Sequence, residues 1–251
     1  MILLFDVGNT NISIGLSDGK NILNTIRLNT EVQKTADEYW IQMKNFFHAD
    51  DIEAVAISSV VPRITEKLKE ISLKRLSKEP LIVGPGVKTG LNIKTDNPRE
   101  VGADLICDAV AVEDTEKPSL VIDLGTAIKY IYVKHKTIRG VIITPGVNIS
   151  IKALVGQTAL LPDIDIEVPK KVLGTNTITC MQSGVTYGVA AQVDGLIDRI
   201  QKEVNDEFQV ILTGGLSETI APLVFAPLER DPDLVLKGLL KIYLRNEPLL
   251  K

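Results

Sequence analysis

Two stretches of the sequence share one pattern, and this repetition constrains the fold more than any other feature. They read "LLFDVGNTNISIG" at residues 3–15 and "LVIDLGTAIKYIY" at residues 120–132. In each, an apolar run typical of a buried strand ends at an aspartate, turns through glycine and threonine, and resumes as a second strand. Asp6 in the first stretch corresponds to Asp123 in the second. A pattern this detailed that occurs twice indicates an internal duplication.

The segments that follow each stretch repeat as well. In the first half, a third strand is followed by a helix capped by Thr35, a strand in "EAVAISSVVP" and a helix that opens at Pro62. In the second half, a third strand in "TIRGVIITP" is followed by a helical stretch from Cys180 and a strand in "FQVILTGGL". Two α/β units of this kind are expected to face each other across a cleft.

The two aspartate turns have the composition of a phosphate-binding site. A glycine-rich turn after a strand lets consecutive backbone N–H groups point into one concavity, which attracts phosphate oxygens. Gly8 would permit close approach, and Thr10 and Asn11 would add hydrogen-bond donors. Asp6 would repel a phosphate unless Mg²⁺, bound through water, lay between the two. The same residue types are common in ordinary turns, so it is the repetition that favours nucleotide binding.

A third glycine turn lies in "LTGGLSE", residues 212–218, and contains Gly214 and Gly215. Backbone that carries no side chain would let the adenine or ribose of a nucleotide lie against it. A simple strand-to-helix turn explains the same residues equally well.

Asp104 is the remaining acidic candidate for chemistry. It follows Gly102 in "NPREVGADLICDAVAV", where the chain becomes helical, and a helix dipole favours negative charge in the first turn. Transfer of a phosphoryl group to an alcohol needs a carboxylate that accepts the hydroxyl proton. Asp104 can be that general base, and simple capping of the helix is the alternative interpretation.

Composition argues against several other classes of function. A net charge of -4 and a pI of about 5.4 give no overall basic surface for nucleic acid. Asp6 interrupts the first apolar run, and no run reaches the roughly 20 residues of a membrane helix, so a cytoplasmic protein is expected. His48 and His135 are predicted to be surface groups, which argues against zinc or histidine-based catalysis. Cys107 and Cys180 match no metal or redox spacing, and both are predicted to be buried.

Six segments together resemble the type III pantothenate kinases, a family of the actin-like ATPase superfamily. They lie in the family's order and approximate spacing between Asp6 and about Leu239. The segments are "DVGNTNISIG", "NPREVGAD", "DLGTA", "PGVNISIKALVGQTALLP", "GTNTITCMQSGVTYG" and "ILTGGL". The resemblance implies two ribonuclease H-like domains, at residues 1–115 and 116–251, with a mixed central sheet in each and a nucleotide cleft between them.

The resemblance also implies a reaction and its requirements. The γ-phosphoryl group of ATP would pass to the primary hydroxyl of pantothenate, which is the first step of coenzyme A biosynthesis. ATP, Mg²⁺ and a monovalent cation, K⁺ or NH₄⁺, would be needed. The family is similar throughout in forming homodimers, with the acceptor site at the subunit interface.

Individual roles follow from the positions that match the family motifs. Asp104 would be the general base, Asp123 would hold the monovalent cation, and Asp6 would face Mg²⁺ through water. The residues that would contact ATP are Asp6, Val7, Gly8, Asn9, Thr10, Asn11, Ile12, Ser13, Thr126, Gly214 and Gly215. The residues that would line the pantothenate site are Thr95, Gly102, Ala103, Asp104, Leu105 and Thr177.

Three departures from the family pattern concern the acceptor. Leu105 stands where the family usually has arginine, Thr95 where it commonly has tyrosine, and "IKYI" at residues 128–131 where it usually has Thr-Thr-Phe-Asp. Neither leucine nor lysine reproduces the forked contact of a guanidinium, although Lys129 could supply the missing charge. Two alternatives therefore stay open. One is a kinase of this fold for another small alcohol, and the other is a nucleotide-binding regulatory protein with weakened catalysis.

Overall fold

The computed structural model describes residues 1–94, 97 and 100–250, and the chain divides into two compact units. The first unit comprises Met1–Asp114, His135–Ile138 and the chain from Asp233 onward. The second unit comprises Thr115–Lys134 and Arg139–Pro232.

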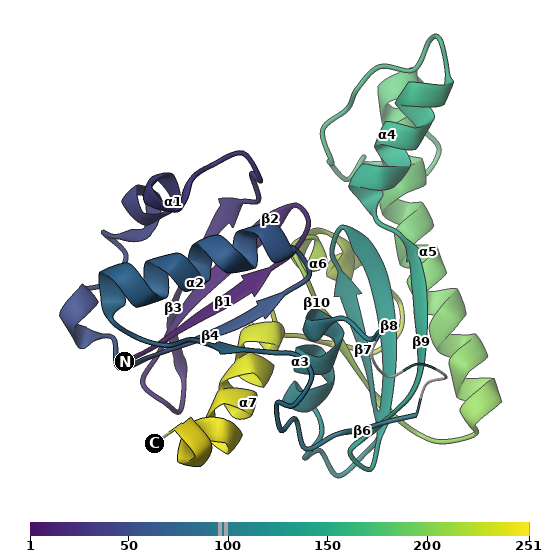
Figure 1. Ribbon diagram of the computed structural model, residues 1–251. Coiled ribbons are helices and arrows are strands. Elements are labelled where there is room, and N and C mark those ends of the chain that lie inside the picture. The colour runs from purple at the N-terminus through teal and green to yellow at the C-terminus, as the bar shows by residue number, and fades with distance from the viewer. Residues whose placement is uncertain (95–96, 98–99, 251) are drawn as a thin grey trace. The chain divides into compact units, whose positions relative to one another are not determined.

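A five-stranded mixed sheet forms the centre of the first unit (Figure 1). Its strands, in order across the sheet, are β3 (Ile22–Asn29), β2 (Asn11–Ser17), β1 (Ile2–Val7), β4 (Ala54–Ser59) and β5 (Leu81–Ile82). β1 pairs antiparallel with β2 and parallel with β4. Leu3 and Phe5 of β1 belong to one apolar cluster, and Ile2 and Leu4 belong to another. β1 is therefore buried on both faces, which explains its continuous apolar sequence.

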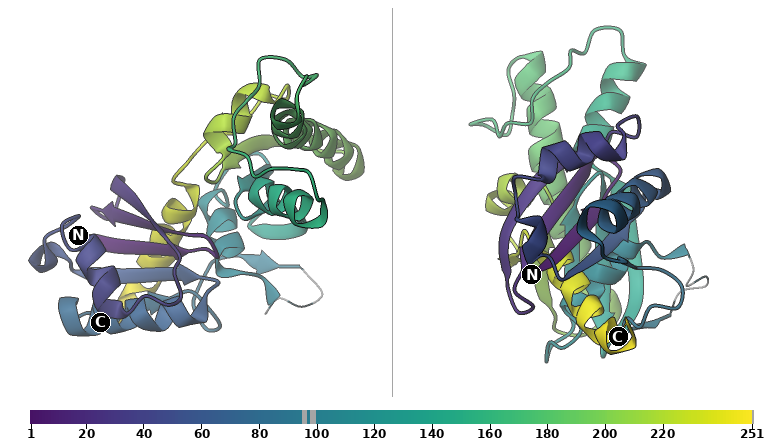
Figure 2. Two further views of the ribbon diagram at one scale, coloured as in Figure 1. Left: turned by 90° about the horizontal axis from the view of Figure 1, so that it is seen from above. Right: turned by 60° about the vertical axis from the view of Figure 1, so that its left-hand side comes forward.

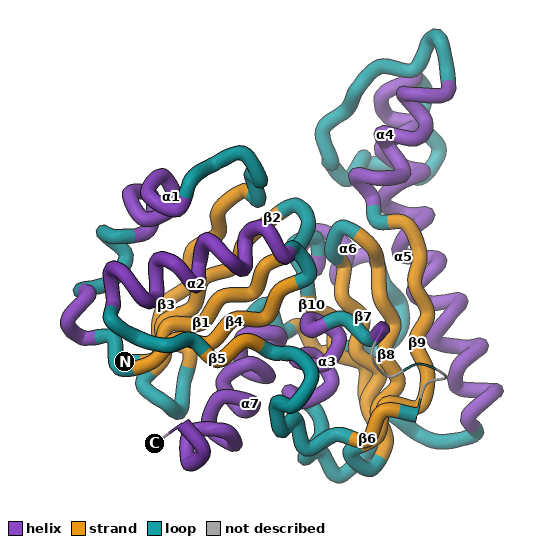
Figure 3. The backbone as a smooth tube through the Cα atoms, viewed as in Figure 1, coloured by secondary structure: helices purple, strands orange, loops and turns teal. Residues whose placement is uncertain are grey.

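Helices cover both faces of this sheet (Figures 1 and 3). The helices that share a cluster with Phe5 are α1 (Ala36–Met43), η1 (Ala49–Asp51) and α2 (Pro62–Leu76). The helices that share a cluster with Leu4 are α3 (Ala103–Ala111) and α7 (Leu234–Leu250). Thr35 caps α1 through the predicted capping box with Glu38, and Pro62 opens α2.

The position of α7 differs from the sequence expectation, which assigned the chain up to residue 251 to the second domain. Its buried side chains complete the cluster that contains Leu4 and Cys107. Gly238 lies so close to the backbone of Cys107 that a Cβ would overlap the carbonyl oxygen. The last helix therefore belongs to the first unit, because its apolar face closes the core beneath β1 and β4.

The sheet of the second unit repeats the topology of the first. Its strands are, in order, β11 (Glu229–Arg230), β10 (Gln209–Thr213), β7 (Ser119–Leu124), β8 (Ala127–Lys134) and β9 (Thr137–Pro145). β7 pairs antiparallel with β8 and parallel with β10, as β1 does with β2 and β4. The order β9-β8-β7-β10 matches β3-β2-β1-β4, which confirms the predicted duplication. The first two residues of β9, Thr137 and Ile138, belong to the first unit, where they pair with β6 (Asn92–Ile93).

Two longer helices stand beside each other in the second unit. α5 (Thr177–Val204) starts three residues before the predicted Cys180, because Asn176 and Thr179 form a capping box ahead of it. α4 (Val147–Gln157) packs along the N-terminal part of α5, as Figure 2 shows. The shorter helices α6 (Ser217–Ile220) and η3 (Ala221–Leu223) follow β10. Within the residues that the structure describes, no helix combines the length and the apolar character that crossing a membrane requires.

Candidate active site

The first aspartate turn joins β1 to β2 and is held by hydrogen bonds from a neighbouring strand end. The Gly8 N–H donates to the Asn11 carbonyl at 2.9 Å. The Thr30 hydroxyl donates to the Gly8 carbonyl at 2.7 Å, and the Thr30 N–H donates to the Thr10 carbonyl at 2.9 Å. The segment from Asp6 to Ser13 that was assigned to ATP therefore forms one hairpin fixed at its tip. Thr30, which does this, was not identified from the sequence.

Only part of this hairpin presents side chains to a ligand. Val7 and Ile12 are buried in the core, so only their backbone groups could reach a nucleotide. Asn9, Thr10 and Asn11 are exposed. This arrangement suits phosphate binding by backbone N–H groups, with polar side chains at the rim.

Asp6 is half-buried at the end of β1, and serines lie opposite it on both neighbouring strands. Ser13 of β2 is its antiparallel partner, and Ser58 of β4 is its parallel partner. The Ser58 hydroxyl donates to Asp6 Oδ1 at 3.1 Å. The signal for Ser58 was present in the sequence, since parallel strands end at the same sheet edge and "EAVAISSVV" ends in serines.

Asp104 lies in the first turn of α3, as predicted, and is half-buried. The Leu105 N–H donates to Asp104 Oδ1 at 2.8 Å, so the carboxylate satisfies one N–H of the first helical turn. A Cβ at Gly102 would lie 2.5 Å from the same oxygen. Gly102 therefore provides the space in which the Asp104 carboxylate sits.

The Cys107 thiol is buried in the first unit, which contains both Asp6 and Asp104. Burial raises the pKa of Cys107 well above its ordinary value, and the charge of Asp6 raises it further. The charges of Asp108 and Asp104 act in the same direction. The predicted burial of Cys107 is confirmed.

The second aspartate turn joins β7 to β8 and is flanked by a largely buried ion pair. Asp123 and Lys129 are cross-strand partners, and Lys129 Nζ lies 2.5 Å from Asp123 Oδ2. The side chains are only 15% and 12% exposed, respectively. The Gly146 N–H donates to the Thr126 carbonyl at 3.1 Å and holds the turn from the start of α4.

The third glycine turn packs against this second aspartate turn. Gly214 has a φ of +89°, and a Cβ there would overlap both Asp123 Oδ1 and the backbone of Leu124. The structure thus brings Asp123, Thr126, Gly214 and the adjoining Gly215 together in the second unit.

The other residues predicted for the acceptor site lie outside the aspartate and glycine turns. Ala103 is half-buried and Leu105 is buried in α3 of the first unit. Thr177 is exposed at the first position of α5 in the second unit. Thr95 lies outside the described residues.

The donors for a metal ion are few. In the described part of the chain, no group of three histidine, cysteine, aspartate or glutamate side chains could hold a metal. Mg²⁺ fits this setting, because it keeps several waters and binds through one or two carboxylates together with substrate phosphates. Asp6 at the phosphate turn is such a carboxylate. His48 and His135 are exposed, as predicted.

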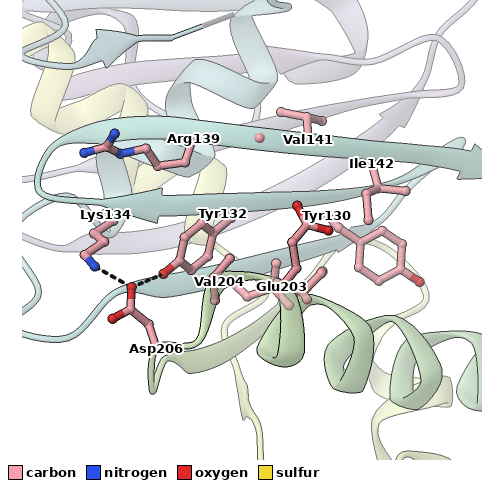
Figure 4. Close-up of a pocket in the computed structure, with 12 residues that line it drawn as sticks. Tyr130, Tyr132, Lys134, Arg139, Val141, Ile142, Glu203, Val204 and Asp206 are labelled. Carbon is pink, nitrogen blue, oxygen red and sulfur yellow. Dashed lines mark hydrogen bonds and ion pairs between the residues drawn. The ribbon is translucent and has the colours of Figure 1, made fainter.

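A pocket of about 470 Å³ lies between β8, β9 and the end of α5 (Figure 4). Asp206 pairs with Lys134 there and accepts a hydrogen bond from the Tyr132 hydroxyl at 3.3 Å. The buried Tyr130 hydroxyl has no hydrogen-bond partner among the described residues, and burial raises the pKa of Tyr130. None of the residues assigned to ATP, metal or acceptor lines this pocket, so we assign it no role in the site.

An apolar groove of about 880 Å³ lies between α4 and α5. The residues that line it include Val147, Leu154, Met181 and Val185, together with Cys180. The prediction that Cys180 is buried is wrong, because Cys180 lies on an exposed side of the first turns of α5.

Comparison with known proteins agrees with this organisation. The sequence pattern of the family described as type III pantothenate kinase matches residues 2–199. A type III pantothenate kinase of Acholeplasma laidlawii is 52% identical over 246 residues, which cover 98% of this chain and 99% of that protein.

Solved structures show the fold. A Campylobacter jejuni protein described as a candidate Baf family transcriptional activator has a TM-score of 0.62 at 19% identity, covering 98% of this chain and 99% of its own. A candidate 2-dehydro-3-deoxygalactonokinase of Sinorhizobium meliloti has a TM-score of 0.60 at 12% identity, covering 99% and 100%. The expected α/β architecture of two duplicated domains is thereby confirmed.

Proposed function

The chain belongs to the type III pantothenate kinase family, and we propose that it transfers the γ-phosphoryl group of ATP to the primary hydroxyl of pantothenate. The product would be 4′-phosphopantothenate, in the first step of coenzyme A biosynthesis. The observation that carries this proposal is the 52% identity over 246 residues, which cover 98% of this chain. ATP as a substrate also favours a cytoplasmic location.

In the first unit, Asp104 accepts the proton of the acceptor hydroxyl. The hydrogen bond from the Leu105 N–H fixes one carboxylate oxygen, and partial exposure keeps the group accessible. A positioned base of this kind contributes roughly 10²- to 10⁴-fold to a proton transfer. From their match to the family motifs, we assign Gly102, Ala103 and Leu105, together with Thr95 and Thr177, to the acceptor site.

The hairpin from Asp6 to Ser13 binds the phosphates of ATP. Because the Gly8 N–H donates to the Asn11 carbonyl within the hairpin, the side chains of Thr10 and Asn11 supply the donors to phosphate. Asp6 is oriented by the Ser58 hydroxyl and holds Mg²⁺ through water. When bound, Mg²⁺ neutralises charge on the transferring phosphoryl group. From their match to the family motifs, we also assign Thr126, Gly214 and Gly215 to ATP binding.

We also propose a homodimer with the acceptor site at its interface. Apolar side chains are exposed on α4, on α5 and on the loop that joins them. They are Ile149, Leu154, Leu160, Val172, Leu173 and Ile178. Such a concentration of exposed apolar surface is typical of an interface. Sedimentation should give twice the monomer mass, and Leu154→Glu should shift the protein toward monomer.

One assay separates the possible activities. Purified protein is incubated with ATP, Mg²⁺, K⁺ and pantothenate, and ADP release is followed. Asp104→Asn should lower kcat by at least about 100-fold. Asp114→Asn is the matched control, because Asp114 follows the same helix but forms ion pairs with Lys136 and Lys241 at the surface.

The buried Leu105 favours a second candidate, a kinase for another small alcohol, because this position lacks the family's usual guanidinium. Turnover with other alcohols but not with pantothenate would support that candidate. Nucleotide binding without any turnover would support a regulatory protein and contradict both kinase assignments.

A further inference from the structure

The strongest unexplained feature outside the phosphate hairpin is the ion pair between Lys129 and Asp123. Asp123 is the residue that the family resemblance assigns to a monovalent cation. In this chain a side-chain ammonium already lies on that carboxylate, with 2.5 Å between Nζ and Oδ2.

The strand register makes this contact a fixed part of the fold. Asp123 of β7 and Lys129 of β8 are directly opposite each other, and Leu124 and Ile128 form the next pair toward the turn. Only residues 125–127 separate these paired strand ends, so the lysine has little freedom to leave its partner. Both side chains are largely buried, where charges interact more strongly than in water.

A free monovalent cation does not fit beside this pair. Coordination of K⁺ requires several oxygens arranged around the ion. Asp123 Oδ2 is occupied by the ammonium, and the backbone of Gly214 packs against Oδ1. A second positive charge on the same carboxylate would also be repelled by Lys129 at short range.

We propose that the Lys129 ammonium serves as this chain's own cation at Asp123, so that the protein needs neither K⁺ nor NH₄⁺ there. A lysine ammonium carries the same unit charge as K⁺ and NH₄⁺ and donates hydrogen bonds as NH₄⁺ does. The pairing also gives Lys129 a partner within its own unit, which differs from the expectation that it compensates for Leu105. The expected independence of turnover from K⁺ rests on the proposed kinase function, whereas the occupation of Asp123 by the Lys129 ammonium does not.

The test compares wild type with Lys129→Thr, which restores the residue type usual for the family. Lys134→Thr is the matched control, since Lys134 lies on the same strand and pairs with a different carboxylate, Asp206. Pantothenate-dependent ADP release is measured in KCl, NH₄Cl, NaCl and choline chloride at equal ionic strength.

Wild type and Lys134→Thr should differ by less than about twofold between KCl and choline chloride. Lys129→Thr should need K⁺ or NH₄⁺ for an activity gain on the order of tenfold, because its buried carboxylate lacks a counter-charge. Wild-type activation of the same size by K⁺ would overturn the proposal, as would a folded Lys129→Thr that is indifferent to the cation.

Thermal unfolding in the same four salts gives a readout that does not depend on turnover. K⁺ should raise the Tm of Lys129→Thr and of Lys129→Gln by on the order of 3 °C or more, and leave wild type unchanged. Equal Tm values for both variants in all four salts would contradict the proposal. If no protein releases ADP with pantothenate, the proposed function fails, and the Tm values still decide the assignment of the cation.

Discussion

The two aspartate turns have the same backbone frame but different cross-strand partners. Asp6 and Asp123 each end a central strand, and each faces a hydroxyl residue on its parallel neighbour, Ser58 or Thr213. On the antiparallel neighbour the partner is a serine for Asp6 and Lys129 for Asp123. The two carboxylates therefore differ because of one cross-strand position. A serine opposite Asp6 leaves that carboxylate suited to a hydrated metal ion, whereas Lys129 neutralises the charge of Asp123.

The largest expected effect comes from the carboxylate assigned to Mg²⁺. Asp6→Asn should lower kcat/KM by about 10²- to 10³-fold, because it removes the charge that holds the ion near the phosphates. The Tm should change little, since Asp6 is only half-buried. Asp18→Asn in the next turn of the same sheet is the control and should behave as wild type. An Asp6→Asn enzyme with unchanged Mg²⁺ dependence would remove the distinction between the two turns.

The second effect concerns stability in the other turn. Lys129→Met should reduce the free energy of unfolding by about 3 kcal/mol, because it leaves Asp123 largely buried without its counter-ion. Lys129→Met combined with Asp123→Leu should recover most of that loss, as apolar replacements of buried ion pairs often do. The coupling energy between Lys129 and Asp123 is measured by urea unfolding of both variants and of Asp123→Leu alone, in buffer free of K⁺. A coupling energy near zero would show that the pair is not a unit.

The glycines of the turns offer a smaller contrast. Gly214→Ala should destabilise the protein by about 2 kcal/mol, because its φ of +89° and its contact with Leu124 both exclude a side chain. At Gly8 a Cβ would lie 3.3 Å from the Asn11 carbonyl oxygen, so Gly8→Ala should cost less than about 1 kcal/mol. Thermal unfolding of both variants checks the order, and the reverse order would contradict this packing.

The smallest effect distinguishes the two thiols. Exposed Cys180 should react with a thiol reagent at pH 8, whereas Cys107 should stay unmodified in the folded protein, because burial and the charge of Asp6 raise its pKa. The raised pKa also means that the unfolded chain loses this proton first as pH rises. Stability from Cys107 is therefore complete below about pH 8.5 and declines above it. Mass spectrometry after brief labelling measures the reactivity, and equal labelling of both thiols would show this reading of Cys107 to be wrong.

Features set by local pattern could be predicted from the sequence. β1 and β7 are buried on both faces, so each appears as an apolar run that ends at its aspartate. The same reasoning located Asp104 at the start of α3, because helix starts favour acidic residues.

Features set by contacts distant in sequence could not be predicted. No helix was predicted from the sequence for the residues of α7, and the place of α7 in the first unit depends on the packing of Gly238 against Cys107. The pairing of Lys129 with Asp123 depends on the register of one hairpin, and a shift of one residue would have turned the lysine to the other face. The departures from the family pattern were therefore visible in the sequence, but the role of Lys129 was not.

We infer that the two duplicated carboxylates, Asp6 and Asp123, have different cation requirements in this pantothenate kinase. The most direct test measures pantothenate-dependent ADP release by wild type while Mg²⁺ and K⁺ are varied independently against choline chloride. We predict an absolute requirement for Mg²⁺ and a rate that K⁺ leaves unchanged within about twofold. Activity without Mg²⁺, or a rate that rises about tenfold with K⁺, would contradict the account.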